Sequence, residues 1–337
     1  MADLPRGPAG PFTAPEGDAA LEEAIRSGLA SVEAMLHETV KSDFPFVTET
    51  SRHLVDAGGK RFRPLLVLLA SQFGDPGAPG IVPSAVVVEL THLATLYHDD
   101  VMDEAEVRRG AVSANARWDN TVAILTGDFL FARASDILAD LGPEAVRLQA
   151  RTFERLVTGQ IRETVGPSAG EDPVEHYLSV LADKTGSLIS TSGRFGAMLA
   201  GATDAEIDVL TRYGERIGVA FQLSDDLLDV LSDATMSGKT PGTDLREGVP
   251  TLPVLLLRRA ARGQDSRLLG LLAAKLTDDA DHAEALRLLR AHPVVSEAQA
   301  VVRSWAEDAR TALEPLPPGP ARDALAALCD QVVGRAV

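Results

Sequence analysis

Cysteine is almost absent from this chain of 337 residues, in which Cys329 is the single example. One cysteine excludes an intramolecular disulfide and is compatible with a reducing compartment. Aromatic residues make up only 4% of the sequence. No apolar run reaches the ~18 to 20 uninterrupted residues that cross a bilayer. We therefore expect a cytoplasmic protein without a membrane span.

Positive charge is also scarce, because 32 lysines and arginines stand against 49 aspartates and glutamates, giving a formal net charge of −17. Nucleic acid needs a basic binding surface, so it is not expected as a partner. Only five lysines occur, and Lys60, Lys184 and Lys239 lie beside glycine or threonine. The concentration of lysine in these segments makes the three residues candidates for binding an anion.

Alternating β-branched residues are scarce, whereas Ala, Leu, Glu and Arg dominate, which favours helix over strand. The first helix is predicted from Asp18, a suitable N-cap. Residues 1–17 are rich in Pro, Gly and Ala and lack the basic start and apolar core of a signal peptide, so we expect a flexible tail. The prediction is an all-α domain over residues 18–337. Residues 250–337 show no chemical motif and are expected to serve packing.

Two acidic triplets share the spacing Asp-Asp-x-x-Asp, and each lies in an apolar segment with helical periodicity. Aspartates four apart share a helix face and repel each other, so a cation is expected to offset the repulsion. Mg²⁺ prefers oxygen ligands and is bound by one or two carboxylates together with phosphate oxygens. One triplet alone fits a solvated acidic surface equally well, but its repetition favours a metal site between facing helices. The triplets are Asp99, Asp100 and Asp103, and Asp225, Asp226 and Asp229.

A basic segment, Gly58–Pro64, precedes a strongly apolar run. Its glycines permit close approach of a ligand, and helix N-termini with basic side chains favour anions. The alternative is a basic helix start without a ligand. Arg108 and Arg109 follow the first triplet closely, and carboxylate-bound metal plus arginine suits a diphosphate.

Two further segments place lysine beside threonine. Lys184 precedes Thr185 in an apolar helical segment, where a carboxylate or anion partner is expected because buried lysines are rare unless paired. Lys239 lies in a Gly/Pro/Thr-rich loop that would close over a phosphate. Its Gly-Lys-Thr is not a nucleotide-binding loop, because Asp233 occupies the position of the required glycine and no strand precedes it. His98-Asp99 is similar to the doublet of metal-dependent phosphohydrolases, but no other histidine is suitably paired.

Five segments together resemble the trans-isoprenyl diphosphate synthase (polyprenyl synthetase) family, in the family's order and over roughly residues 50–255. They are Gly58–Pro64, His92–Gly110, Lys184-Thr185, Gln222–Asp229 and Gly238–Pro253. The resemblance implies a helical bundle around a deep central cavity, usually in a homodimer. It also implies isopentenyl diphosphate and an allylic diphosphate as substrates, with three Mg²⁺ ions held by the two triplets.

The resemblance assigns roles to individual residues. It implies that Lys184, Lys239 and Arg108 contact the allylic diphosphate, with Thr185 and Gln222 nearby. It implies that Lys60, Arg63, His92 and Arg109 contact isopentenyl diphosphate, with Gly59 in the same loop. The implied catalytic residues are Asp99, Asp100, Asp103, Lys184, Lys239 and Asp225.

Product length is expected to depend on side chains that precede Asp99, because the family's chain grows along this helix. The predicted wall consists of Thr95, Ala94, Thr91 and Val87. Ala94 is small where short-chain members carry an aromatic, which indicates a long product, from heptaprenyl to nonaprenyl diphosphate, as a quinone side-chain precursor. A geranylgeranyl or farnesyl diphosphate synthase of the same family is the alternative. A long apolar product also allows peripheral contact with a membrane during its release.

Two other functions share parts of this pattern. A class I terpene cyclase has the fold and the first triplet, but its second metal motif normally mixes Asn, Ser or Thr, and Glu. A non-catalytic partner subunit usually lacks aspartates, and all six are present here. One departure from the family is Val249, where many relatives carry a lysine; this leaves more of the loop's charge to Lys239, and we expect activity to survive.

Overall fold

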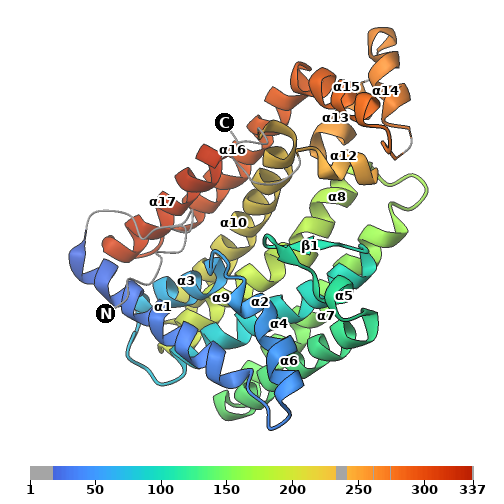
Figure 1. Ribbon diagram of the computed structural model, residues 1–337. Coiled ribbons are helices and arrows are strands. Elements are labelled where there is room, and N and C mark those ends of the chain that lie inside the picture. Colours follow the sequence, from blue (N-terminus) through green and yellow to red (C-terminus); the bar gives the residue numbers. More distant parts are fainter. Residues whose placement is uncertain (1–17, 233–240, 261, 274, 336–337) are drawn as a thin grey trace. The chain divides into compact units, whose positions relative to one another are not determined.

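The computed structural model describes residues 18–232, 241–260, 262–273 and 275–335. Helices dominate, which confirms the predicted all-α class (Figure 1). The predicted tail over residues 1–17 and Lys239 lie outside the described residues. The elements are α1 (Ala19–Thr39), α2 (Pro45–Asp56), α3 (Phe62–Ala70), η1 (Ser71–Phe73), α4 (Ile81–Met102), β1 (Val107–Arg108), β2 (Ala111–Val112), α5 (Ala114–Arg117), α6 (Asn120–Leu141), α7 (Pro143–Val165), α8 (Pro173–Leu181), η2 (Ala182–Gly186), α9 (Ser187–Leu199), α10 (Asp204–Leu231), α12 (Thr243–Glu247), α13 (Leu252–Ala260), η3 (Gly263–Asp265), α14 (Ser266–Leu271), α15 (Asp279–Arg290), α16 (Val294–Ala312) and α17 (Pro320–Arg335).

The described chain forms two compact units. Unit 1 takes in the chain up to Phe153 together with Leu188–Gly214 and Leu313–Leu328. Unit 2 consists of Glu154–Ser187, Glu215–Ala312 and the chain from Cys329 onward. The first aspartate triplet therefore belongs to unit 1 and the second to unit 2.

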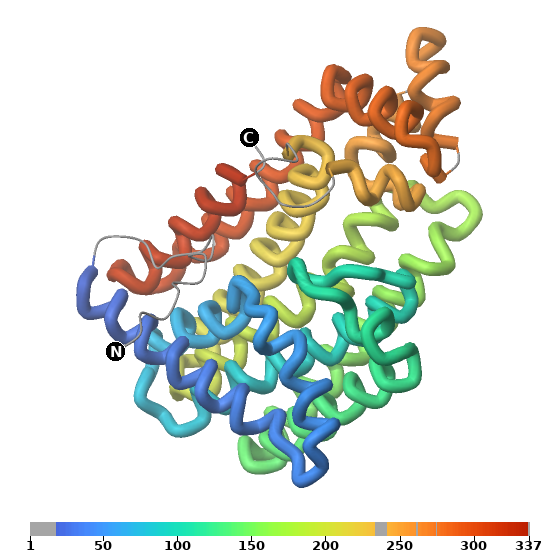
Figure 2. Tube along the Cα trace, viewed as in Figure 1, coloured from blue at the N-terminus to red at the C-terminus, as the bar shows by residue number. Residues whose placement is uncertain are grey.

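The core of unit 1 is built around α4, which packs against α1, α3 and α6. In Figures 1 and 2, α4 and α6 lie side by side, in agreement with their contacts. The apolar run of α4 supplies fully buried side chains such as Val87 and Leu90. Gly127 of α6 lets the two helices approach, because a Cβ there would meet the carbonyl oxygen of Ala94 at 3.1 Å. Burial of this helix holds the first triplet at its C-terminal end.

A short antiparallel hairpin follows α4 and returns two arginines toward it. Val107 pairs with Val112, and Arg108 pairs with Ala111. Gly110, at a φ of 77°, makes the tight turn between the strands. The hairpin is the one pair of strands in the described residues.

Unit 2 has its own apolar core, formed by α8, the second half of α10 and the helices α12 to α16. Asp172 begins α8 by accepting hydrogen bonds from the backbone N–H groups of Val174 at 2.8 Å and Glu175 at 3.1 Å. Val219, Leu223 and Leu227 of α10 are buried in this core. Burial of this face fixes the rotation of α10, so that Asp226 of the second triplet is buried as well.

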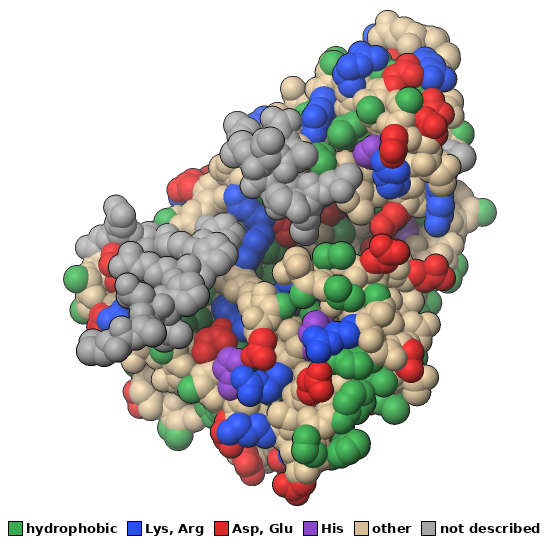
Figure 3. Space-filling model, in the orientation of Figure 1, with side chains coloured by type: hydrophobic (Ala, Val, Ile, Leu, Met, Phe, Trp, Pro, Cys, Tyr) green, Lys and Arg blue, Asp and Glu red, His purple; other side chains and the backbone are tan. Residues whose placement is uncertain are grey.

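No helix among the described residues is long and apolar enough to cross a membrane. On the face seen in Figure 3, acidic and basic side chains are interspersed. Charges of both signs are therefore distributed over that face.

Candidate active site

The first triplet occupies the end of α4, where Asp103 is the C-cap and its N–H donates to the carbonyl of Asp99 at 2.8 Å. Asp100 is fully buried, and its Oδ1 accepts from Nε of Arg108 at 2.6 Å. Its Oδ2 is buried without a hydrogen-bond partner. Burial raises the pKa of the Asp100 carboxyl, and Arg108 opposes that rise. The hairpin thus places the guanidinium of Arg108 beside the buried carboxylate of Asp100, whose Oδ2 remains available as an acceptor.

A basic cluster surrounds His92 in the same unit. The pKa of His92 lies well below its usual value, first because the imidazole is desolvated and then because arginines repel a proton on it. These arginines are, in decreasing effect, Arg63, Arg109, Arg108 and Arg61. Four guanidinium groups within electrostatic range of a neutral imidazole form a strongly positive site, which suits a diphosphate.

Backbone geometry at Gly59 explains how the cluster packs. Gly59 has a φ of 149°, and a Cβ there would meet the guanidinium carbon of Arg109 at 2.9 Å and Nη1 of Arg61 at 3.0 Å. Arg109 donates to the carbonyl oxygens of Leu54, at 3.1 Å, and Gly58. Lys60 is exposed in the same turn. The predicted isopentenyl diphosphate residues Gly59, Lys60, Arg63, His92 and Arg109 therefore belong to one region of unit 1.

The predicted chain-length residues lie on α4 before the first triplet, where Thr91 and Ala94 are fully buried and Thr95 is half-buried. Thr91 donates to the carbonyl of Val87 at 2.8 Å and accepts from Nε2 of Gln149, also at 2.8 Å. Gln149 on α7 was not predicted, and its Oε1 is buried without a hydrogen-bond partner. No signal in the sequence distinguishes this glutamine from other polar residues of α7.

The second triplet lies near the end of α10 in unit 2, and its three carboxylates have different partners. Asp226 accepts from the hydroxyl of Tyr177 and from Nε2 of Gln222 at 2.8 Å. Burial raises the pKa of Asp226 to about 6, although these two donors oppose the rise. Asp225 forms an ion pair with Arg335 of α17. Arg335 lies in the segment that we expected to show no chemistry, and only the folded chain brings it to the triplet.

Asp229, the third carboxylate of the second triplet, accepts hydrogen bonds from the start of the next described helix, α12. Its two carboxylate oxygens accept from the backbone N–H groups of Thr243, at 3.1 Å, and Asp244, at 3.0 Å, at the N-terminus of α12. Its backbone carbonyl accepts from Gly242 at 2.7 Å. The last aspartate of the triplet therefore connects the end of α10 to the start of α12.

Lys184 and Thr185 lie in a π-helical turn, Ala182–Gly186, between α8 and α9. Gly159 of α7 allows this turn to approach, because a Cβ there would meet the backbone nitrogen of Lys184 at 2.7 Å. Nζ of Lys184 donates to Glu163 at 2.5 Å, which supplies the expected carboxylate partner. Thr185 donates to Oε1 of Gln222 at 3.1 Å, so the Lys-Thr pair and the second triplet are linked within unit 2.

Both triplets offer hard oxygen donors, which is the ligand type of Mg²⁺. No group of three or more His, Cys, Asp and Glu side chains among the described residues is arranged to hold a metal by itself. In proteins Mg²⁺ usually keeps several waters and takes further ligands from substrate phosphates. The unpartnered Oδ2 of Asp100 is an available donor of this kind.

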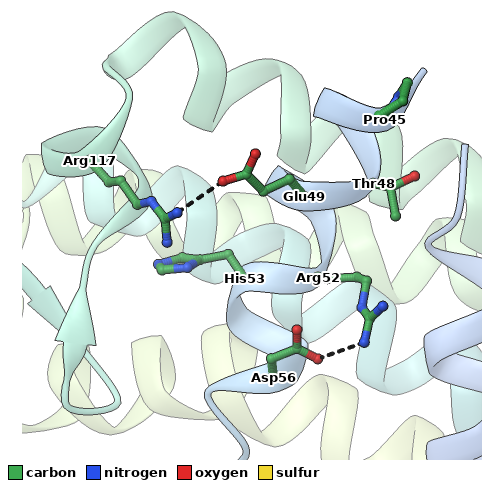
Figure 4. Close-up of a pocket in the computed structure, with 7 residues that line it drawn as sticks. All are labelled: Pro45, Thr48, Glu49, Arg52, His53, Asp56 and Arg117. Atoms are coloured by element: carbon green, nitrogen blue, oxygen red, sulfur yellow. Dashed lines mark hydrogen bonds and ion pairs between the residues drawn. The ribbon is translucent and has the colours of Figure 1, made fainter.

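A surface hollow of about 530 Å³ in unit 1 provides a contrast to the basic cluster (Figure 4). It is lined by residues of α2 and by Arg117 of α5. Its charges are paired within the hollow, with Arg117 to Glu49 at 2.9 Å and Arg52 to Asp56 at 3.5 Å (Figure 4). None of the predicted site residues lines it, and its charge balance gives no preference for an anion. The basic cluster around His92 remains the candidate site of unit 1.

Comparisons with known proteins identify the family. Residues 44–289 match the model of the family described as Polyprenyl synthetase. Nonaprenyl diphosphate synthase of Mycobacterium tuberculosis is 51% identical over 320 residues, covering 95% of this chain and 96% of that protein. Heptaprenyl diphosphate synthase component 2 of Geobacillus stearothermophilus is 35% identical over 309 residues, covering 91% of this chain and 95% of that protein.

The solved structures include a similar enzyme. The crystal structure of geranylgeranyl pyrophosphate synthase from Corynebacterium glutamicum, complexed with calcium and isoprenyl diphosphate, has a TM-score of 0.85 and 45% identity. The similarity covers 95% of this chain and 98% of that one. The chain belongs to the polyprenyl synthetase family, whose members are prenyltransferases that depend on a divalent metal.

Proposed function

We propose that the protein condenses isopentenyl diphosphate with an allylic diphosphate to make a long-chain all-trans polyprenyl diphosphate. The observation that carries this proposal is the basic cluster around neutral His92, linked to the buried Asp100 through Arg108. An anion site next to an acidic metal-ligand site suits two diphosphates that react with each other. The 51% identical nonaprenyl diphosphate synthase supports the long product.

We infer, from the family resemblance, that both triplets hold Mg²⁺ for the allylic diphosphate, with three ions in total. The ligands would be Asp99, Asp100 and Asp103, and Asp225, Asp226 and Asp229. When bound, Mg²⁺ neutralises the negative charge that develops on the leaving diphosphate. Arg108, Lys184 and Lys239 would add direct contacts, with Thr185 and Gln222 positioning the lysine turn.

The protein's own residues then have defined tasks. Lys60, Arg63, His92 and Arg109 orient isopentenyl diphosphate, and His92 acts as a neutral hydrogen-bonding group because its pKa is low. The apolar side chains of α4 exclude water from the allylic cation after the C–O bond breaks. The proton lost after C–C bond formation passes to the departing diphosphate, so no basic side chain is required for that step.

The growing chain is proposed to follow α4 from Asp99 toward Ile81. Eighteen residues of α-helix extend about 27 Å at 1.5 Å per residue. Ala94, Thr95 and Thr91 would form the wall, and the small side chain of Ala94 would leave the path open. We propose products from heptaprenyl to nonaprenyl diphosphate, serving as quinone side-chain precursors. Release of so apolar a product would involve contact with a membrane surface, although the enzyme itself works in the cytoplasm.

We also propose a homodimer. Large apolar side chains are exposed on two long helices, with Ile124 and Leu125 on α6 and Val157 and Ile161 on α7. Exposed apolar patches of this kind commonly mark interfaces between subunits. Light scattering after size-exclusion chromatography tests this: the wild type should have twice the chain's mass, and Leu125→Glu should shift it toward the monomer.

One incubation tests the main proposal. Purified protein is mixed with Mg²⁺, isopentenyl diphosphate, and farnesyl or geranylgeranyl diphosphate, and the products are separated by chromatography. Each condensation adds one five-carbon unit to the allylic diphosphate. Heptaprenyl to nonaprenyl products therefore correspond to elongated diphosphates of 35 to about 45 carbons, and these are expected. A hydrocarbon would indicate a cyclase. Activity that appears only with a second protein would indicate a component like that of the two-component heptaprenyl enzyme named above.

A further inference from the structure

A pair of buried charges lies beside the basic cluster, and neither member is among the residues predicted to touch a substrate. Arg61 is 8% exposed and Glu89, in the middle of α4, is 2% exposed. Nη1 of Arg61 donates to Oε1 of Glu89 at 2.8 Å. A charged pair in an apolar core is costly unless both groups are well bonded, so its presence calls for a specific role.

The guanidinium of Arg61 is fully engaged by the protein. It donates to Glu33 of α1 through Nε and through Nη2 at 3.1 Å. It also donates to the carbonyl oxygens of Val55, at 3.2 Å, and Gly58, at 3.3 Å. With its donors used and its side chain buried, Arg61 is placed to hold α1, the end of α2 and α4 together rather than to bind a ligand.

Glu89 lies between two arginines. Its Oε1 is 3.9 Å from Nη2 of Arg109, in addition to its bond with Arg61. Arg61 and Arg109 both have left-handed backbone conformations, with φ of 47° and 54°. Such conformations are unfavourable for residues with a side chain and persist where the surroundings enforce them. One buried carboxylate thus anchors two strained arginines from different loops.

The anchored positions are the ones on which the basic cluster depends. Lys60 and Arg63 flank Arg61 in sequence, and His92 follows Glu89 by three residues, on the same side of α4. Arg61, Arg63, Arg108 and Arg109 all act electrostatically on His92. Without a counter-charge these guanidinium groups would repel each other. Glu89 supplies this counter-charge from within the protein, to Arg61 and Arg109.

We propose that Arg61 and Glu89 are positioning residues for isopentenyl diphosphate, which hold Lys60, Arg63, His92 and Arg109 in the geometry that binds its diphosphate group. This inference rests on the proposed function of the basic cluster. Neither residue touches the substrate; both act through the backbone of Gly58–Arg63 and through Arg109.

The test is Glu89→Gln, which keeps the shape and removes the charge. The KM for isopentenyl diphosphate is expected to rise ~10- to 100-fold, because displacement of binding groups by about an ångström has effects of this size. The KM for the allylic diphosphate should change less than about twofold, since most of its predicted contacts lie in unit 2. Isothermal titration with isopentenyl diphosphate alone gives the matching Kd, because without an allylic primer no turnover occurs.

A matched control is Asp265→Asn, which also converts a buried carboxylate to an amide. Asp265 of unit 2 is 7% exposed; it accepts from the backbone N–H of Arg262 at 2.8 Å and lies 3.3 Å from His292, and neither partner is a predicted substrate residue. This variant should leave both KM values unchanged. A rise in the KM for isopentenyl diphosphate equal to that of Glu89→Gln would contradict the positioning role.

A double variant separates positioning from mere stability. Arg61→Met with Glu89→Met replaces the pair by apolar groups, which often restores stability lost when one partner is removed. We expect the Tm to recover relative to Glu89→Gln while the KM for isopentenyl diphosphate stays high. Recovery of that KM together with the Tm would overturn the proposal.

A milder variant covers the case in which Glu89→Gln does not fold. Glu33 is 38% exposed and holds Arg61 from the solvent side. Glu33→Gln should raise the KM for isopentenyl diphosphate by ~2- to 5-fold, since one of two carboxylate partners remains. An unchanged KM would count against the role of Arg61.

Two outcomes distinguish this inference from the proposed function. A wild-type protein that elongates no primer contradicts the proposed function itself. If the wild type is active and the variants change both KM values equally, only the positioning role is contradicted.

Discussion

The ends of α4 and α10 carry the same Asp-Asp-x-x-Asp spacing, yet their surroundings differ. At the end of α4, the buried Asp100 is held by a cation, Arg108, at 2.6 Å. At the end of α10, the buried Asp226 is held by neutral donors, Tyr177 and Gln222. Burial raises the pKa of both carboxyls, and that of Asp226 reaches about 6.

The same spacing of aspartates therefore occurs in two different electrostatic environments. An arginine compensates the negative charge of the first triplet and at the same time belongs to the basic cluster. In the second triplet, Asp225 is paired with Arg335 from the last helix and Asp229 with the start of α12. The first triplet is therefore coupled to an anion site, and the second is coupled to segments that follow it in the chain.

The largest effect is expected from removing one carboxylate charge in each triplet. Asp99→Asn and Asp225→Asn should each lower kcat by about 10²- to 10³-fold, the usual loss when one group that stabilises developing charge is removed. Steady-state kinetics at saturating Mg²⁺ measures this. If only one variant loses activity, the two triplets do not act on the same diphosphate.

A stability comparison comes next. Arg108→Met leaves the buried Asp100 without a cation and should lower the free energy of unfolding by about 3 kcal/mol. Tyr177→Phe removes one neutral donor from Asp226 and should cost about 1 kcal/mol. Urea unfolding of both variants gives the two values. Equal losses would show that the cation at the first triplet has no special role.

Product length tests the segment that precedes the first triplet. Ala94→Phe places an aromatic ring at a fully buried position of α4 and should shorten the product by at least one five-carbon unit. Chromatography of the products measures the change. Ala139→Phe, at an exposed position of α6, is the matched control and should leave product length unchanged; unaltered products from Ala94→Phe would exclude Ala94 from the cavity wall.

The smallest effect concerns pH and the basic cluster of unit 1. The folded protein keeps His92 neutral, whereas the unfolded chain takes up a proton as the pH falls through about 6.5. The contribution of His92 to stability should therefore decrease from pH 7 to pH 5, by at most about 1.4 kcal/mol per pH unit, whereas Asp226, with its pKa of about 6, contributes with the opposite sign below pH 6. His92→Gln should flatten this part of the curve, measured by urea unfolding at several pH values. An unchanged slope would mean that His92 is protonated in the folded state.

Much of the fold and of the site could be predicted from local sequence. The helical class follows from composition, and the Asp triplets, Gly58–Pro64 and Lys184-Thr185 are short segments whose spacing carries their chemistry. The carboxylate partner expected for Lys184 was found as Glu163. Glu89 gave a signal that was overlooked, since it is a lone charge in the apolar run Val86–Leu90.

Local sequence is enough to establish which residues carry charge, how they are spaced along each helix, and that a chain with one cysteine folds without an intramolecular disulfide. Which carboxylate meets which cation depends on the folded chain. Arg335 reaches Asp225 across 110 residues of chain, and Glu89 contacts Arg61 across 28. Such pairings depend on how apolar helix faces pack, and packing joins residues whose distance along the chain carries no information about their distance in space.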